Sequence, residues 1–107
     1  MNPNQLASQM ISEASQVAIN SWNAIKSTAV TEFRGLSQRI VMIARLYAQG
    51  EISKAGARRH FKAARYHVIA ILAMLTALVE AAAAKIVNAA LKVIADAVNA
   101  AIGFKLV

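Results

Sequence analysis

The sequence predicts an all-α protein: a long antiparallel helical hairpin, which kinks could divide into three or four helices, packing laterally in an oligomer. Apolar residues recur with a helical period over two long stretches, Pro3 to Gln49 and Val68 to Ile102. The strongest turn signal, Gly50, lies near the midpoint of the chain. Apolar residues make up 58% of the 107 residues, which argues against a disordered chain and fits one domain over 1–107.

The first arm is predicted over 3–49. Asn2 can cap a helix whose first residue is Pro3, since the first helical position needs no N–H. Ten apolar steps then span 36 residues, a mean of 3.6, through Ile11, Ala14, Ala18, Trp22, Ile25, Ala29, Phe33, Leu36, Ile40, Ile43 and Tyr47. This period predicts one long helix or two nearly collinear ones, with Trp22 and Tyr47 in the hairpin core. Gly35 is the predicted weak point, with a kink or break between Lys26 and Gly35.

The turn is predicted at 50–53 and the second arm at 54–103. Gly50 can end a helix in the left-handed conformation, and Ser53 can cap the next one. Two arms of similar length joined by a short loop should pack antiparallel, each roughly 65–75 Å long at 1.5 Å per residue. Gly103 ends the second arm before a short apolar tail, 104–107. The predicted hinges are Gly35, Gly50 and Gly56.

The second arm carries only a narrow polar stripe: Thr76, Glu80, Lys85, Asn88, Lys92, Asp96 and Asn99. A helix with so wide an apolar surface is typically buried between neighbours. A short chain buries a limited fraction of its surface, so we expect a homo-oligomer. The candidate self-association residues are Leu72, Leu75, Val79, Ile86, Val93, Ile94 and Val98.

Positive charge is concentrated in the middle of the chain. The net charge is +7, and residues 34–67 hold eight Lys or Arg against one Glu. Like charges one turn apart destabilise a helix, and an anionic partner would relieve that cost. The sequence therefore predicts contacts with nucleic-acid backbone or an anionic membrane, although a solvated patch is the plainer interpretation. The candidate contacts are Arg39, Arg45, Lys54, Arg58, Arg59, Lys62 and Arg65.

A membrane interpretation uses the same residues. Eighteen residues, 67–84, carry a single charge, Glu80, and follow the basic cluster directly. This resembles a transmembrane segment with a positive flank and an interfacial tyrosine, Tyr66. Its many alanines and Glu80 weaken the case for insertion.

Several chemistries find no support in the sequence. There is no Cys, and His60 and His67 have no carboxylate cluster beside them, so we expect neither a metal site nor a cofactor. Lys92 and Asp96 form an ordinary i,i+4 pair. With no phosphate loop and no catalytic constellation, we expect no enzyme and no small-molecule substrate. The N-terminus does not resemble a signal peptide, which predicts cytoplasmic synthesis followed by a virion or membrane location.

In its overall plan the chain resembles small α-helical virion proteins, such as coat subunits of filamentous or spindle-like viruses or phage ejection proteins. The resemblance rests on Ala-rich helices beside a basic segment and on no motif. It implies a self-assembling structural protein whose apolar helices pack together while the basic segment meets nucleic-acid or lipid phosphates. The alternatives are a membrane-inserting protein of holin, pore-forming or bacteriocin type, and a small sequence-indifferent nucleic-acid-binding dimer.

Overall fold

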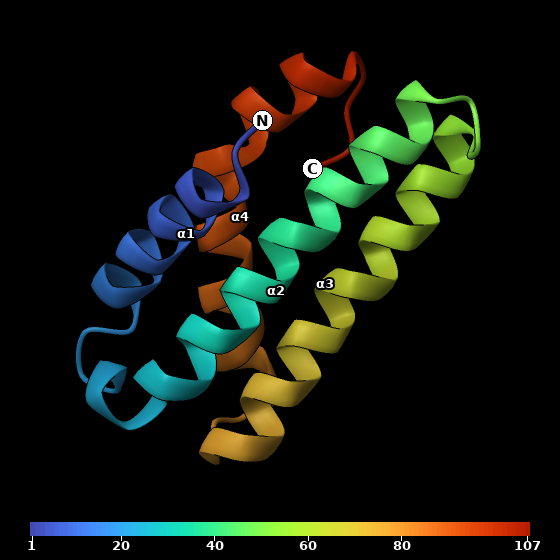
Figure 1. Ribbon diagram of the computed structural model, residues 1–107. Coiled ribbons are helices and arrows are strands. Elements are labelled where there is room, and N and C mark those ends of the chain that lie inside the picture. Colours follow the sequence, from blue (N-terminus) through green and yellow to red (C-terminus); the bar gives the residue numbers. More distant parts are fainter.

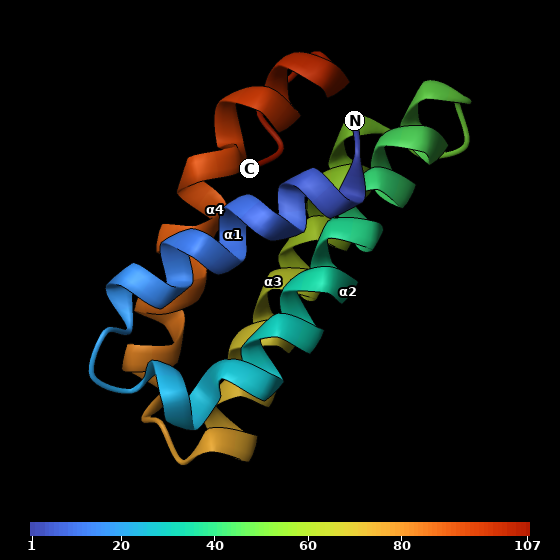
Figure 2. The ribbon, with the colours of Figure 1, turned by 60° about the vertical axis from the view of Figure 1, so that its left-hand side comes forward.

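The computed structural model describes residues 1–107 as four α-helices, with no strand. They are α1 (Pro3–Val17), α2 (Trp22–Ala48), α3 (Lys54–Thr76) and α4 (Glu80–Ile102). Short connections make successive helices antiparallel, and α4 closes the bundle by packing on α1 as well as α3 (Figures 1 and 2). The all-α, antiparallel prediction is thus confirmed.

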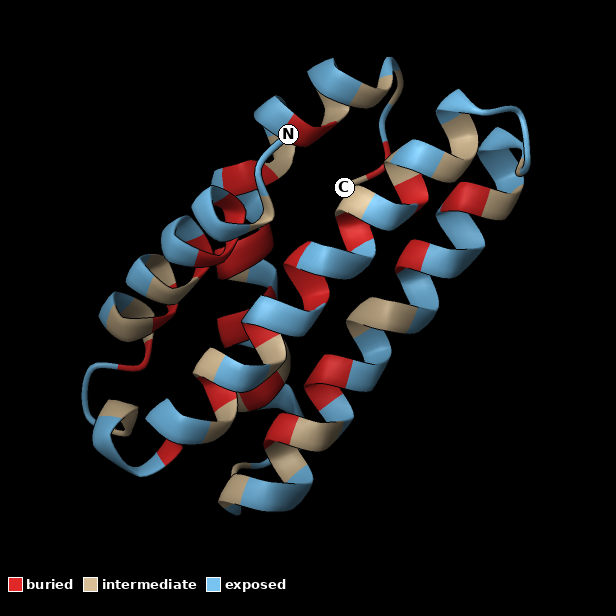
Figure 3. Cartoon of the chain, in the orientation of Figure 1, coloured by how far each residue is buried: buried red, intermediate tan, exposed pale blue.

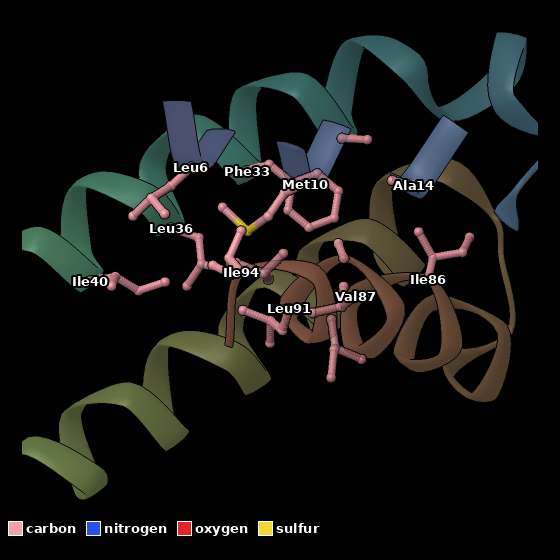
Figure 4. Close-up of a cluster of buried hydrophobic side chains, with 14 of the residues drawn as sticks. Leu6, Met10, Ala14, Phe33, Leu36, Ile40, Ile86, Val87, Leu91 and Ile94 are labelled. Atoms are coloured by element: carbon pink, nitrogen blue, oxygen red, sulfur yellow. The ribbon is translucent and has the colours of Figure 1, made fainter. Parts of the chain in front are cut away.

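One continuous core holds the four helices together. Each helix turns its buried residues toward the other helices and its exposed residues outward (Figure 3). At its centre lie three fully buried side chains from three helices: Met10 of α1, Phe33 of α2 and Ile94 of α4 (Figure 4). A small residue, Ala57, is also fully buried and marks where α3 approaches the core closely. Burial of large side chains of this kind contributes about 1.5–3 kcal/mol each.

The predicted helix caps at Asn2 and Ser53 and the predicted glycine helix ends at Gly50 and Gly103 are confirmed. The Asn2 Oδ1 atom accepts hydrogen bonds from the backbone N–H groups of Asn4 (2.8 Å) and Gln5 (3.4 Å), with Pro3 at the first helical position. At the second turn the Ser53 Oγ accepts from Gly56 N at 3.0 Å. Gly50 and Gly103 both take the left-handed conformation that ends a helix (φ 74° and 92°).

The prediction of one helix, or two collinear ones, over 3–49 is wrong. The helix ends at Val17, residues 18–21 form turns, and α2 runs back along α1. The whole molecule measures 42 × 22 × 18 Å, so no arm reaches the expected length. The break contains no Gly or Pro. It is held by hydrogen bonds to the Ala18 carbonyl from Ser21 N (2.7 Å) and Ser21 Oγ (3.2 Å).

The second arm is also divided. Ala77 adopts a left-handed conformation (φ 61°), and the extended Val79 precedes α4. Glu80 then stands in the first turn of α4, where its charge complements the helix dipole. Among the predicted hinges, Gly50 lies in a turn, whereas Gly35 and Gly56 lie inside α2 and α3 without interrupting either helix. The break that the sequence allowed between Lys26 and Gly35 is therefore absent, and bends at these two glycines stay a prediction.

A candidate phosphate-binding face

One side of α3 presents a row of cations. Lys54, Arg58 and Lys62 are exposed and Arg65 is half-buried, and their spacing places them on one side of the helix. That side faces α4 and the C-terminal tail: Arg58 Nε donates to Lys105 O (3.2 Å), and Arg65 Nη1 lies 3.5 Å from Asn88 Oδ1 of α4. We call these four residues the basic face.

The tail, residues 104–107, supports one end of this face. The Phe104 ring lies 5.8 Å from Lys54 Nζ and 5.1 Å from Arg58 Cζ, within cation–π range of both. Its other neighbour is Tyr47, whose ring meets it edge-to-face at a centroid distance of 4.9 Å. Two cations are therefore positioned by a ring distant in sequence.

Asn99 on α4 binds the last two residues of the tail. Its Oδ1 accepts hydrogen bonds from Leu106 N (2.8 Å) and Val107 N (2.9 Å), and its Nδ2 donates to Val107 O (3.1 Å). Leu106 is buried beneath. Sequence reasoning assigned Asn99 only to the polar stripe of the second arm. One signal in the sequence could have indicated this role: Asn99 lies four residues before Gly103, where its side chain can bind backbone groups of the chain that turns back after the helix.

The other end of the basic face carries a second aromatic ring. Tyr66 is 51% exposed and lies 5.1 Å from Arg65 Cζ and 6.0 Å from Lys62 Nζ. The sequence predicts for this tyrosine only a role at a membrane interface. Its proximity to Lys62 follows from the i−4 spacing on a helix, whereas Arg65 is its neighbour in the chain.

None of the twelve Lys and Arg residues has a carboxylate partner within 4.0 Å. The only contact of ion-pair type joins His67 Nε2 to Glu32 Oε1 at 3.9 Å, and it carries opposite charges only when the histidine is protonated. The predicted pair between Lys92 and Asp96 is not formed. The Nε of Arg65 is buried and has no hydrogen-bond partner. The cations of the basic face are therefore uncompensated within the chain.

The other predicted phosphate contacts lie elsewhere. Arg39 lines an open groove between α2 and α3, together with Glu32, His60 and His67. Arg59 lines a hollow beside the turn before α3, and Arg45 is exposed near the end of α2. The structure thus separates the seven candidates into a row of four on the basic face and three outside it.

The candidate self-association residues also divide. Leu72, Ile86, Ile94 and Val98 are buried within the chain's own core, so their assignment to contacts between copies is wrong for this fold. Leu75, Val79 and Val93 are exposed. Leu75 and Val79 lie at the end of the bundle formed by the α1–α2 and α3–α4 connections (Figure 1). We call the exposed apolar residues of this region the apolar end: Ile19, Met74, Leu75 and Val79.

Other kinds of site are not evident. No three His, Asp or Glu side chains gather where they could share a metal ion. No helix combines the length and apolar character needed to cross a bilayer, and the segment 67–84 is interrupted at 77–79. No protein family, curated protein or solved structure matches the chain.

Proposed function

We propose that this protein is a non-enzymatic structural protein that binds the phosphate backbone of nucleic acid through the basic face. The observation that carries the proposal is the row of cations without carboxylate partners. Like charges one turn apart repel by a few tenths of a kcal/mol per pair. Phosphates bound along the row would remove that repulsion and would release counterions, which is the main source of sequence-indifferent affinity.

Nucleic acid suits this face better than a membrane surface does. A protein that lies on a bilayer combines basic residues with adjacent apolar side chains that enter the lipid. Here Leu75, Val79 and Ile19 are at the apolar end, whereas Lys54 and Arg58 lie beside the α2–α3 turn at the opposite end of the bundle. Of the exposed large apolar residues, only Tyr66 lies against cations of the basic face, and one ring is not a group of side chains that could anchor the protein in lipid. The row therefore favours contact with phosphates in solution.

Salt dependence of binding tests the proposal. The affinity of the parent protein for DNA should fall with salt, and Lys62→Ala should reduce the slope of log affinity against log salt by about 0.7–0.9, the contribution of one lost phosphate contact. Lys26→Ala is the matched control, because it removes the same charge from α2 near the apolar end, away from the basic face.

Two outcomes would contradict this assignment. If both lysine variants change the slope equally, binding depends on net charge and not on the basic face. If the protein ignores DNA at low salt yet attaches to anionic liposomes in a way that high salt does not reverse, the partner is a membrane.

Self-association through the apolar end is the second proposal. Ile19 and Val79 are 76% and 71% exposed, and Met74 and Leu75 are 70% and 66% exposed. Large apolar side chains gathered at one end of a small protein are typical of a contact surface. Copies that associate through the apolar end would leave their basic faces outside the interface. Such a subunit would suit a coat or packaging protein, in which apolar contacts join copies and basic faces meet the packaged nucleic acid.

Sedimentation tests this second proposal. The parent protein should sediment as a species larger than the monomer, and Leu75→Lys should produce monomers, because burying an unpaired charge in a contact is costly. Met42→Lys, on the exposed side of α2, should leave the assembly unchanged. A parent protein that remains monomeric at every concentration would end the proposal.

A further inference from the structure

Tyr66 is the one exposed large apolar residue that lies against cations of the basic face. Met74, Leu75, Val79 and Ile19 share the apolar end, whereas Tyr66 stands halfway along α3 beside two cations of the basic face. It is the one aromatic residue classed as exposed. Its hydroxyl has no hydrogen-bond partner in the chain, and the ring is absent from the core and from the residues packed on it. Packing of the fold therefore does not account for this ring.

The surroundings of the ring match the parts of a single-strand binding surface. Such surfaces combine cations that follow the backbone with aromatic rings on which bases stack. Lys62 Nζ and Arg65 Cζ lie 6.0 and 5.1 Å from the Tyr66 ring centroid, close enough for their charges to reach phosphates next to a stacked base. The contact of Arg65 with Asn88 orients the guanidinium along the α3–α4 surface.

We propose that Tyr66 is a stacking platform for a base of single-stranded nucleic acid, with Lys62 and Arg65 binding the phosphates beside that base. This inference rests on the proposed function and specifies its ligand. In a duplex the base faces are covered by neighbouring bases, so a ring on α3 could meet only base edges or backbone. In a single strand the bases can turn outward, and the face of one becomes available to the ring.

Removing the ring while keeping the charges tests the inference. We would measure the binding of oligothymidylate, of an abasic strand with the same number of phosphates, and of a duplex of equal length. Tyr66→Ala should weaken oligothymidylate binding roughly 5- to 150-fold, the range measured for loss of one stacked base. Its affinity for the abasic strand and its salt slope should remain those of the parent protein, because no charge is lost.

Two control variants accompany this measurement. Tyr66→Phe keeps the ring and should bind oligothymidylate within about twofold of the parent, because stacking does not need the hydroxyl. Met42→Ala removes a partly exposed apolar side chain from α2 and should change no affinity. Tyr66→Phe and Met42→Ala should unfold at the temperature of the parent, since both positions lie outside the core. Tyr66→Ala loses two exposed cation–π contacts and should stay fully folded at the temperature of the binding assay.

The outcomes separate this inference from the proposed function. If the parent protein binds neither strand at low salt, the proposed function fails and the inference falls with it. If the parent binds oligothymidylate and the abasic strand equally, and Tyr66→Ala binds both as the parent does, phosphate binding stands and the stacking platform is refuted. Equal weakening of both strands by Tyr66→Ala would likewise refute it, because the ring would then act only by placing the cations.

Discussion

Replacing Asn99 with Ala should detach the C-terminal tail from the bundle. The side chain makes three hydrogen bonds, of 2.8, 2.9 and 3.1 Å, and all of them go to the backbone of Leu106 and Val107. Alanine cannot replace any of them. The substitution therefore tests whether the tail depends on one side chain for its place.

The magnitude follows from the hydrogen bonds and from Leu106. Each bond contributes about 0.5–1.5 kcal/mol net, and water can replace part of this in a half-exposed segment. Alanine regains roughly 0.5 kcal/mol through its higher helix propensity. If the tail leaves altogether, the burial of Leu106 is lost as well, about 1.5–3 kcal/mol. We expect a loss of about 2 kcal/mol in the free energy of unfolding when the tail stays partly seated, and up to about 4 kcal/mol when it leaves.

Urea unfolding followed by circular dichroism measures this change. Asn88→Ala is the control, because it gives the same gain in helix propensity at an exposed position of α4 and loses only the 3.5 Å contact with Arg65. Amide exchange of Leu106 and Val107 should accelerate only in Asn99→Ala. If the two variants unfold at the same urea concentration and Leu106 keeps its protection, the reasoning about the tail is refuted.

Two backbone substitutions should stabilise the protein in the same urea assay. Gly35→Ala should raise the free energy of unfolding by about 0.5–1 kcal/mol, since a Cβ there meets no atom within 4 Å and the residue lies inside α2; a loss of stability would mean that α2 needs a flexible residue there. Ala77→Gly should raise the free energy of unfolding by about 0.5–1 kcal/mol, because glycine adopts the left-handed conformation without the steric cost that alanine has there. The greater conformational entropy of glycine in the unfolded chain offsets part of this gain. An unchanged or lower unfolding midpoint would show that the α3–α4 turn is not strained.

The first-arm prediction identified the core face and missed the reversal. No member of its apolar stripe is exposed, and eight of the eleven are buried. The connection 18–21 has four residues, about one helical turn. A turn of that length keeps the apolar residues in phase on both sides, so periodicity cannot distinguish a straight helix from a chain that folds back. Only packing of α1 between α2 and α4 decides between them.

The break in the second arm was hidden for a different reason. Alanine is the best helix former, so Ala77 in an Ala-rich run predicts continuation. In the structure the chain leaves the helix there, and Leu78 packs against the core while α4 turns back onto α1. Tertiary burial of α4 outweighs the local preference of one residue. The wide apolar surface that suggested contacts between copies is covered in large part by the chain's own helices.

Prediction of the site succeeded where neighbours are local and failed where they are distant. The row from Lys54 to Arg65 follows from helical spacing alone. The contact of Arg58 with Lys105 joins residues 47 positions apart, and no pattern in the sequence indicates it. The same holds for Phe104, whose position depends on Gly103, Asn99 and the packing of Leu106.

The two rings beside the basic face explain how its four cations stay accessible in the free protein without carboxylate partners. Four cations within three helical turns repel one another, and such a row commonly pairs with carboxylates. Here Phe104 and Tyr66 take that place, each within cation–π distance of two cations. Each contact contributes roughly 0.5–1 kcal/mol at an exposed site, which is enough to offset repulsions of a few tenths per pair. Because a ring neutralises no charge, the cations stay positioned and available, and a phosphate strand can bind without first breaking ion pairs.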